Sequence, residues 1–193
     1  MDERTVPRHA EEMGAIFLSR LGIDVESPEM KRTPLRFAQA LAELTRNLRV
    51  PFDAGAVLAR QFEPPAQHPQ IVLLCDIPFT SLCEHHILPF TGTATVGYLP
   101  QPGAKVAGIS KLARLVEGFS LRPQMQERMG QQVVQALGDH LDIQGAGCLI
   151  DAVHTCLTLR GPRSAGARMV TSHLTGCFLD APVRQEFLAL AGK

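Results

Sequence analysis

The chain has 193 residues, 45% of them hydrophobic, and its 19 Lys and Arg residues are balanced by 19 Asp and Glu residues. This length and hydrophobic content suffice for a substantial core, so we expect residues 1–193 to form a single domain. The net charge of zero excludes a general electrostatic attraction to nucleic acid or to an anionic membrane, and we expect neither as a partner. Any anionic ligand must then be held by a local cluster of cations.

The N-terminal residues and the cysteines indicate the cellular location. The first ten residues mix charges of both signs and lack the apolar run of a signal peptide, and no apolar stretch approaches the roughly 20 residues that cross a bilayer. We therefore expect a cytoplasmic protein. The odd number of cysteines argues against a disulfide framework. Two of the five, Cys148 and Cys177, have apolar neighbours and are interpreted as small buried hydrophobic residues.

A helical region is predicted for about residues 1–61. Apolar residues recur from residue 11 to Leu21, and Gly22 follows as a helix stop. A second helix is expected to begin at Thr33 and Pro34, because Thr caps helix N-termini and Pro suits the first turn. Residues 62–70 contain three prolines, which break both helices and strands, so this segment is interpreted as a connector.

Strands are predicted after the connector. Residues 71–75 form a short apolar run typical of a buried strand, and residues 87–98 alternate Thr and Val with small residues. Two amphipathic helices follow, the first with Ser110 as its expected N-cap and the second with Met129 and Val133 on its apolar stripe. A last helix is expected over residues 181–191, with Asp180 as its cap.

Residues 146–160 are predicted to form a strand between the second amphipathic helix and the last helix. With a period of two, His154, Cys156 and Arg160 would point to the same side of this strand. The order of helices, strands, helices, strands and a final helix favours an α+β fold with a largely antiparallel sheet over alternating βαβ units. No glycine-rich phosphate loop of either common type is present.

Two short clusters pair thiols with imidazoles. The first contains Cys83, His85 and His86, and the second contains His154 and Cys156. Thiolate and imidazole are ligands that Zn2+ prefers, and three protein ligands leave a fourth position open for water, as catalytic zinc requires. Cys83 and His86 have the spacing of a two-ligand turn. Softness alone does not decide whether His154 or Cys156 supplies the third ligand.

The remaining histidines of these clusters are candidates for proton transfer. His85 lies beside a ligand but projects differently in a turn, and the ordinary imidazole pKa of about 6.5 suits proton transfer near a metal-bound water. The alternative for His85 is an unreactive, solvent-facing histidine. If Cys156 binds the metal, His154 becomes a second proton-transfer group.

Cations gather near the expected start of the first amphipathic helix. Lys111, Arg114 and Arg122 would ordinarily form a solvated helix face, but a helix that begins at Ser110 attracts phosphate at its N-terminus. Arg160 can join them. Glu127 is by composition a surface acid, although a carboxylate also matches the adjacent ring N–H and amino donors of guanine.

Four motifs together resemble the GTP cyclohydrolase I family, zinc enzymes that convert GTP to 7,8-dihydroneopterin triphosphate with release of formate. The resemblance runs from Thr33 to the C-terminal helix and is densest at residues 83–86, 108–114, 122–128 and 154–161. It implies that a zinc-activated water attacks C8 of guanine, after which hydrolysis opens the ring and expels formate.

The resemblance also implies a role for each matching residue. Zinc would be held by Cys83, His86 and Cys156. Acid-base chemistry would fall to His85 and His154, with Ser110 taking part in later proton transfers on the ribose. Guanine would be recognised by Gln126 and Glu127, and the triphosphate would be surrounded by Ser110, Lys111, Arg114, Arg160 and Arg36.

The family has a tunnelling fold (T-fold), in which sheets of several subunits join into a barrel. The resemblance therefore implies a homo-oligomer, a decamer of two pentamers, with active sites between subunits.

Two departures, Gln39 and Cys75, stand where relatives often carry basic residues, and they predict weaker phosphate affinity. One alternative is a non-catalytic oligomer that binds a purine or pterin, but it would require the loss of some of the five Cys and His residues, and all five are present. Another alternative is a pterin synthase, but it would not explain Gln126 and Glu127 beside several cations.

Overall fold

The computed structural model describes residues 6, 8–63 and 69–192, which divide into two compact units, Met1–Val50 and Pro51–Lys193. The second unit begins before the predicted helical region ends, because α4 (Ala54–Leu58) belongs to it. The expectation of one domain over residues 1–193 stays a prediction. No helix among the described residues has both the length and the hydropathy to span a bilayer.

The N-terminal unit contains α1 (Arg8–Arg20), α2 (Thr33–Leu44) and the short α3 (Arg46–Arg49). Helices α1 and α2 pack through a stacked pair of rings, Phe17 and Phe37, with centroids 6.2 Å apart. Gly22 follows α1 with a φ of 84°, which confirms the predicted stop. The predicted start of α2 is confirmed, but Thr33 is not its cap, since Arg32 occupies that position and the Thr33 hydroxyl contacts the Met30 sulfur.

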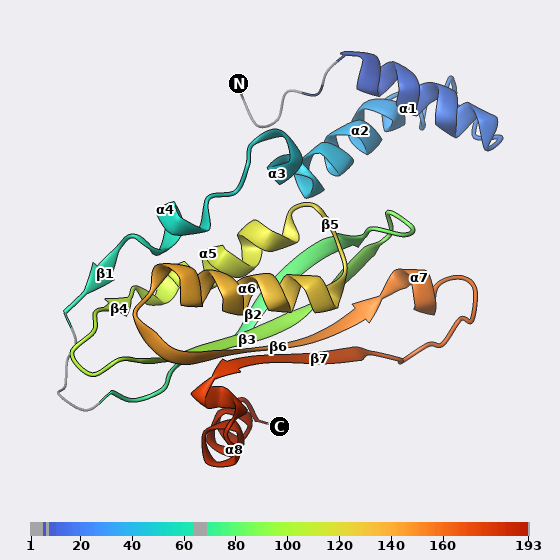
Figure 1. The fold of residues 1–193 in the computed structure, drawn as a ribbon. Coiled ribbons are helices and arrows are strands. Elements are labelled where there is room, and N and C mark those ends of the chain that lie inside the picture. Colours follow the sequence, from blue (N-terminus) through green and yellow to red (C-terminus); the bar gives the residue numbers. More distant parts are fainter. Residues whose placement is uncertain (1–5, 7, 64–68, 193) are drawn as a thin grey trace. The chain divides into compact units, whose positions relative to one another are not determined.

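A five-stranded sheet forms the centre of the second unit, in the order β5-β2-β3-β6-β7 (Figure 1). Four strands are antiparallel, and the two-residue β5 runs parallel to the end of β2. This arrangement confirms the α+β fold. The strands are β2 (Val72–Cys83), β3 (Pro89–Pro100), β5 (Pro123–Gln124), β6 (Ile143–His154) and β7 (Met169–Gly176).

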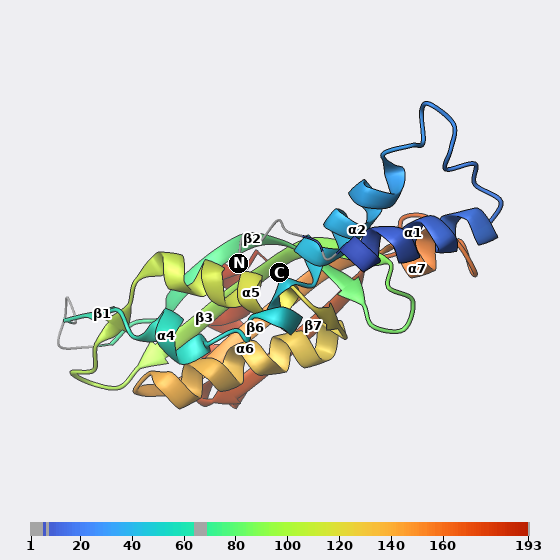
Figure 2. The ribbon, with the colours of Figure 1, turned by 90° about the horizontal axis from the view of Figure 1, so that it is seen from above.

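Helices cover one face of this sheet. Figure 2 shows α5 (Ile109–Ser120) and α6 (Gln126–His140) lying over the strands, and their apolar stripes meet the sheet in one core that includes Leu112, Val133 and Ile150. On the opposite face, α8 (Ala181–Leu190) and the 3-10 turn η1 (Cys177–Leu179) pack Phe178 and Phe187 against Leu149. The sheet is thus buried on both sides over part of its area.

Three sequence predictions are corrected by local structure. Helix α5 begins at Ile109 with Gly108 as its N-cap, so Ser110 lies within the first turn. The predicted strand over residues 146–160 ends at His154, where α7 (Thr155–Thr158) begins. The predicted connector is shorter at its start, because β1 (Gln61–Phe62) pairs with β4 (Val106–Ala107); its residues 64–68 lie outside the described residues.

Candidate metal centre and active site

The first Cys and His cluster forms a tight turn after β2. The backbone carbonyl of Cys83 accepts hydrogen bonds from the N–H groups of His86 at 3.3 Å and Ile87 at 2.8 Å. The N–H of Cys83 donates to the carbonyl of Leu88 at 2.8 Å. Closing this turn places Ile87 at a φ of 53°, a conformation that is strained for a β-branched residue. The turn therefore has a defined shape that fixes where its side chains project.

Cys156 approaches this turn from a distant segment. One ligand atom each from Cys83, His86 and Cys156 lies within 4.8 Å of the other two. Sγ of Cys83 is 3.7 Å from Nδ1 of His86. Zinc bonds of about 2.3 Å to sulfur and about 2.0 Å to nitrogen give a separation of about 3.5 Å in a tetrahedron. The Cys83 and His86 pair is close to this spacing, and two sulfurs with one nitrogen are donor types that suit Zn2+.

The position of Cys156 depends on α7 rather than on strand alternation. The Thr155 hydroxyl donates to the carbonyl of Pro89 at 2.6 Å, which ties α7 to the start of β3. Burial, followed by the hydrogen bond with Cys83, raises the pKa of the Cys156 thiol. A divalent cation between the two sulfurs has the opposite effect, because it stabilises thiolates. Cys156, rather than His154, thus completes the group that suits a metal.

His154 is the last residue of β6, and its ring is held from two directions. The ring stacks on Phe90 with centroids 4.4 Å apart and planes 6° apart. Its Nε2 lies 2.9 Å from Oε1 of Gln126. Burial lowers the pKa of His154, against a smaller opposing effect of the Glu127 carboxylate. The arrangement therefore favours a neutral imidazole in a fixed orientation beside the Cys83, His86 and Cys156 group.

Gln126 and Glu127 open α6 but have different surroundings. The Gln126 side chain is 1% exposed, and its amide nitrogen donates to the carbonyls of Met169 and Ile150 at 3.0 and 3.2 Å and to the Thr171 hydroxyl at 3.1 Å. Glu127 is exposed. The structure thus leaves Glu127 accessible to a ligand, whereas the hydrogen bonds of Gln126 lie within the protein.

His85 lies in the turn of residues 83–88, between two residues of which His86 is a candidate metal ligand. Its Nδ1 is 3.9 Å from Sγ of Cys83, and its ring meets that of His86 at 80° with centroids 6.4 Å apart. The Nδ1 atoms of both histidines thus lie near the Cys83 sulfur, His86 at 3.7 Å and His85 at 3.9 Å, and the role expected for His85 stays a prediction. His85 is exposed, a position from which it can exchange protons with solvent or substrate.

The cations of the first turns of α5 lie at the other end of the sheet. The N–H of Ala107, just before α5, donates to the hydroxyl of Tyr98 at 2.8 Å, and Tyr98 pairs with Val72 at the start of β2. Cys83 is at the end of this 12-residue strand, roughly 35 Å away at about 3.3 Å per residue. Within one chain, the structure therefore does not bring Ser110, Lys111 and Arg114 to the Cys83, His86 and Cys156 group.

The other predicted cations also have defined places. Arg160 is exposed, follows α7 and acts electrostatically on Cys156. Arg122 does not join the cluster near Ser110, because it lies after α5 and donates to Oε1 of Gln132 at 2.7 Å. Arg36 is exposed on α2 of the N-terminal unit, and its expected phosphate contact stays a prediction.

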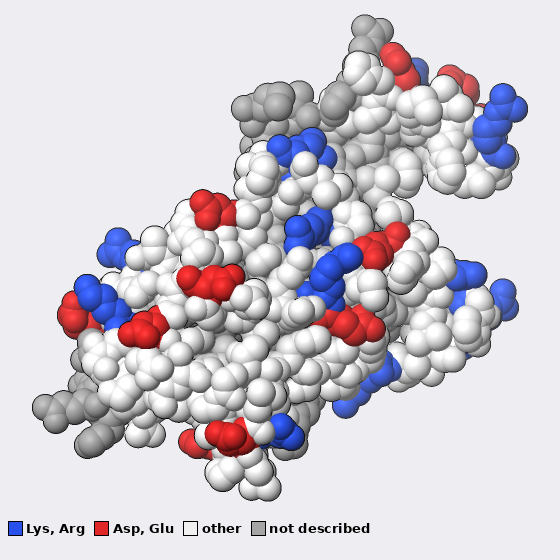
Figure 3. Space-filling model, viewed as in Figure 1, with Lys and Arg blue, Asp and Glu red and all other residues white. Residues whose placement is uncertain are grey.

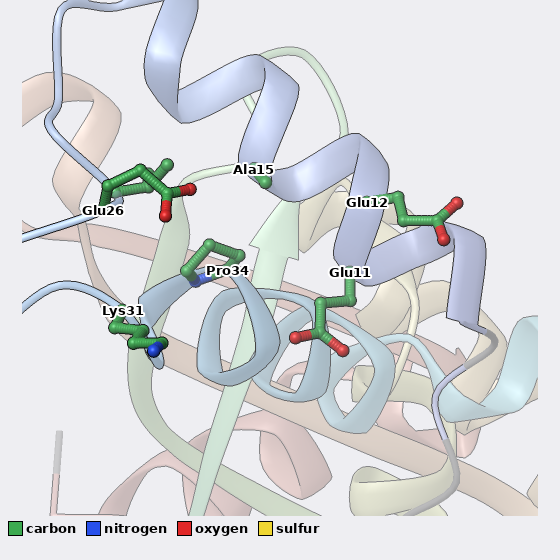
Figure 4. A pocket seen from close by; sticks show the side chains of 7 residues that line it. Glu11, Glu12, Ala15, Glu26, Lys31 and Pro34 are labelled. Atoms are coloured by element: carbon green, nitrogen blue, oxygen red, sulfur yellow. The ribbon is translucent and has the colours of Figure 1, made fainter.

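Two hollows elsewhere contain none of the predicted site residues. One, of about 390 Å³, lies within the N-terminal unit and is lined by side chains from α1, α2 and the segment between them, including Glu11, Glu26 and Lys31 (Figure 4). The other, of about 420 Å³, lies along α6 and includes Arg128 and Asp139. On the face drawn in Figure 3, described acidic and basic side chains are interspersed, in line with the balanced composition.

Several supporting residues were not predicted from the sequence. Phe90, Gln124, Arg128 and Tyr98 each hold a site residue or a site element in place. The sequence did not reveal these supporting roles, because each of the four residues contacts a partner in another helix or strand. A weak signal existed for Arg128, because it follows Gln126 and Glu127 directly in a polar helix start.

The fold and site together define an α+β protein whose Cys–His–Cys group is suited to a catalytic metal, with a clamped histidine beside it. A family model described as GTP cyclohydrolase I matches residues 10–192. The chain belongs to the GTP cyclohydrolase I family and is an enzyme of that family. This confirms the resemblance carried by the four motifs.

Curated relatives match almost the whole chain. The GTP cyclohydrolase 1 of Dehalococcoides mccartyi (strain ATCC BAA-2266 / KCTC 15142 / 195) is 42% identical over 190 residues, covering 98% of this chain and 96% of that protein. GTP cyclohydrolase 1 from Carboxydothermus hydrogenoformans is 41% identical, covering 92% and 90%. A solved structure, the archaeosine synthase QueF-Like in the apo form, covers 56% of this chain and 95% of its own, with 16% identity and a TM-score of 0.44.

Proposed function

We propose that the protein hydrolyses and rearranges GTP to 7,8-dihydroneopterin triphosphate and releases formate. The convergence of Cys83, His86 and Cys156 carries this proposal, because three Cys and His ligands that leave a fourth position for water are typical of catalytic zinc. Membership of the GTP cyclohydrolase I family supports GTP as the substrate. A cytoplasmic location stays a prediction.

Three side chains bind the metal in this proposal. Cys83, His86 and Cys156 hold one Zn2+, which when bound supplies an activated water for attack at C8 of guanine. The tight turn after Cys83 and the short α7 before residue 160 keep the three side chains converging. The remaining steps belong to neighbouring side chains of the protein.

Two histidines move protons in the proposed reaction. Burial lowers the pKa of His154 and Gln126 orients its ring, so His154 can take up a proton at the purine and release it again. His85 is exposed, which allows it to return protons to solvent. Glu127 accepts hydrogen bonds from the ring N–H and amino group of guanine, since it is the exposed carboxylate beside His154.

We also propose that a complete active site requires more than one copy of the chain. The first turns of α5 carry Ser110, Lys111 and Arg114, which we assign to the triphosphate and to later proton transfers on the ribose. They lie at the far end of β2 from Cys83 in the same chain, so a neighbouring copy must supply them. Arg160, close to Cys156, contributes a cation from the first copy.

The sheet offers a way to join copies. Strand β7 is the last strand in the sheet order, and no strand among the described residues pairs with its outer edge. Exposed strand edges promote pairing with another chain, and closing several sheets into a barrel removes the edges altogether. We propose that the chain adopts the tunnelling fold in a homo-oligomer, a decamer of two pentamers.

The function is tested with Cys156→Ala and wild-type protein loaded with zinc. We expect wild-type protein incubated with GTP to release formate and 7,8-dihydroneopterin triphosphate in equal amounts, and Cys156→Ala to lose both zinc and formate release. Cys75→Ala is the matched control, because Cys75 is an exposed thiol outside the metal-binding group. Full activity in zinc-free Cys156→Ala would refute the site, and formate without the pterin would refute the complete reaction.

A further inference from the structure

We propose that Gln126 is the residue that orients His154 and makes Nδ1 the ring nitrogen through which His154 transfers protons. The inference rests on the proposed function, since it concerns the His154 side chain in the GTP reaction. It gives Gln126 a role different from the guanine contact implied by the family resemblance. Gln126 is thus a positioning residue, which acts on the substrate through His154.

The orientation of the Gln126 amide is fixed by its acceptors. Its nitrogen lies 3.0 Å from the carbonyl oxygen of Met169 and 3.2 Å from that of Ile150. Neither carbonyl can donate a hydrogen bond. Rotating the amide by a half turn would place its oxygen against both of them, in a site where Gln126 is 1% exposed. The amide nitrogen must therefore face the two carbonyls, and Oε1 must face His154.

This orientation selects one tautomer of His154. Oε1 of Gln126 lies 2.9 Å from Nε2 of His154, and an amide oxygen can only accept a hydrogen bond. Nε2 therefore carries the hydrogen, and in the neutral ring Nδ1 holds the lone pair. Nδ1 is the one ring nitrogen that can gain and lose a proton while the Gln126 hydrogen bond stays intact.

Phe90 completes the restraint on the ring. Its fully buried side chain stacks on the imidazole with centroids 4.4 Å apart and planes 6° apart, which fixes the plane of the ring. The hydrogen bond from Nε2 fixes the rotation within that plane. Together the two contacts define the direction of Nδ1, as an oriented proton-transfer group requires.

Gln126 also couples this ring to the guanine-binding carboxylate. As the first residue of α6 it reaches Ile150 of β6 and Thr171 of β7, so one side chain joins three elements. The next residue, Glu127, is exposed at the same helix start. A shift of α6 would therefore move the Glu127 carboxylate and the His154 ring together. The distance between the group that recognises the base and the group that transfers protons would then stay the same.

The tautomer is tested directly in the wild-type protein. Zinc-loaded protein labelled with 15N in histidine is examined by solid-state NMR at mildly alkaline pH, where the imidazole is neutral, and the His154 signals are assigned by their loss in His154→Asn. We expect a protonated Nε2 and an unprotonated Nδ1. The opposite pattern overturns the inference. This measurement needs no turnover, so it separates the inference from the proposed function.

Kinetics test the positioning role. Gln126→Met removes the acceptor at similar volume, and we expect kcat for formate release to fall about 10- to 100-fold while KM for GTP and zinc content are unchanged. Gln144→Met is the matched control, because Gln144 also donates to a carbonyl, that of Pro100, but at the other end of β6, and its kcat should equal that of wild type.

The outcomes are distinguishable. A raised KM with an unchanged kcat in Gln126→Met would make Gln126 a substrate ligand and overturn the inference. If Gln126→Met does not fold, the NMR pattern of the wild-type protein decides alone. If wild-type protein releases no formate from GTP, the proposed function fails, whereas the NMR pattern still decides which nitrogen of His154 carries the proton.

Discussion

Arg128 of α6 forms an ion pair with Glu84, the residue that follows the candidate metal ligand Cys83 in the turn after β2. Nε of Arg128 also donates to the side-chain oxygen of Gln124 at 3.0 Å, and the N–H of Glu84 donates to the Gln124 carbonyl at 3.0 Å. The hydrogen bond from Arg128 holds the pKa of the Glu84 carboxyl below its usual range. Both the backbone and the side chain of Glu84 thus fasten the turn to the start of α6.

Loss of this ion pair should weaken metal binding without unfolding the protein. In Arg128→Met we expect the Kd for Zn2+ to rise about 10-fold, because Cys83 and His86 become less well oriented. Competition with a chromophoric chelator measures the Kd. Lys105→Met is the control, since it removes an exposed ion pair with Glu63 outside the site, and its Kd should equal that of wild type. Equal affinities in Arg128→Met and wild type would contradict the role of the pair.

Tyr98 should ionise at unusually high pH. Burial raises the pKa of its phenol, and the hydrogen bond from the N–H of Ala107 opposes this shift only in part. Tyr98 is the single tyrosine of the chain, which also lacks tryptophan, so ultraviolet difference absorbance reports this phenol alone. We expect the titration midpoint to lie above that of a model tyrosine peptide and to return to the model value in denaturant.

The same shift predicts a loss of stability in alkali. Because the pKa of Tyr98 is raised in the folded protein, the unfolded chain loses the phenol proton at a lower pH than the folded chain does. Tyr98 therefore contributes its full stabilisation below the ordinary tyrosine pKa, and this contribution is lost as the pH rises through the folded pKa. Tyr98→Phe should remove this dependence. At neutral pH it should cost about 1–2 kcal/mol, because the Ala107 N–H loses its acceptor. Urea titrations of wild type and Tyr98→Phe across the alkaline range measure both effects. If the free energy of unfolding of the two proteins falls in parallel with pH, Tyr98 is not the group responsible.

Gly92 should not tolerate a side chain. It lies opposite Ala152 in the β3–β6 pair, and an added Cβ would meet the Asp151 carbonyl oxygen at 2.0 Å and the Ala152 Cα at 2.6 Å. Since both are backbone atoms, Gly92→Ala must separate the strands, at a cost of about 3 kcal/mol. Gly138→Ala is the counterpart in α6, where nothing lies within 4 Å, and it should gain about 0.5–1 kcal/mol. Denaturant unfolding of both variants tests the contrast.

Cys148 should resist alkylation in the folded protein. Complete burial in the sheet raises the pKa of its thiol to about 12, whereas Cys75 is exposed. Thiolate is the reactive form, so a short treatment with iodoacetamide at neutral pH should modify Cys75 and leave Cys148 intact until denaturant is added. Peptide mass spectrometry identifies the modified residues. Modification of Cys148 at a rate similar to that of Cys75 would show that the core opens readily.

Strand periodicity predicted the site up to the point where the backbone changes conformation. The alternation in β6 correctly puts Ile150, Ala152 and His154 on the helix-covered side. It fails at Cys156, because the Thr155 hydroxyl binds the Pro89 carbonyl and α7 begins there. Thr155 and Pro89 are 66 positions apart, so no local sequence pattern reveals their contact. The sequence alone therefore could not distinguish a strand from a helix at residues 155–158.

The start of α5 shows the same limit. Ser110 is a favourable cap by residue type, yet the helix begins one residue earlier, after Gly108. Pairing of β4 with β1 and the hydrogen bond from Ala107 to Tyr98 set where the extended chain ends, and both partners lie in other strands. Strand β7 was not predicted, because its polar and apolar residues give only a weak alternation before it pairs with β6.

The sequence by itself determined the donor chemistry and the family of this protein. Thiols and imidazoles at 83–86 and 154–156 indicate a borderline-soft metal such as Zn2+ by residue type, and that inference needs no coordinates. Only the tertiary structure decided that Cys156 joins Cys83 and His86, that Gln126 holds His154, and that the cations of α5 lie at the opposite end of the sheet. Which side chains meet depends on strand length, register and backbone hydrogen bonds between distant residues, which local sequence patterns do not encode.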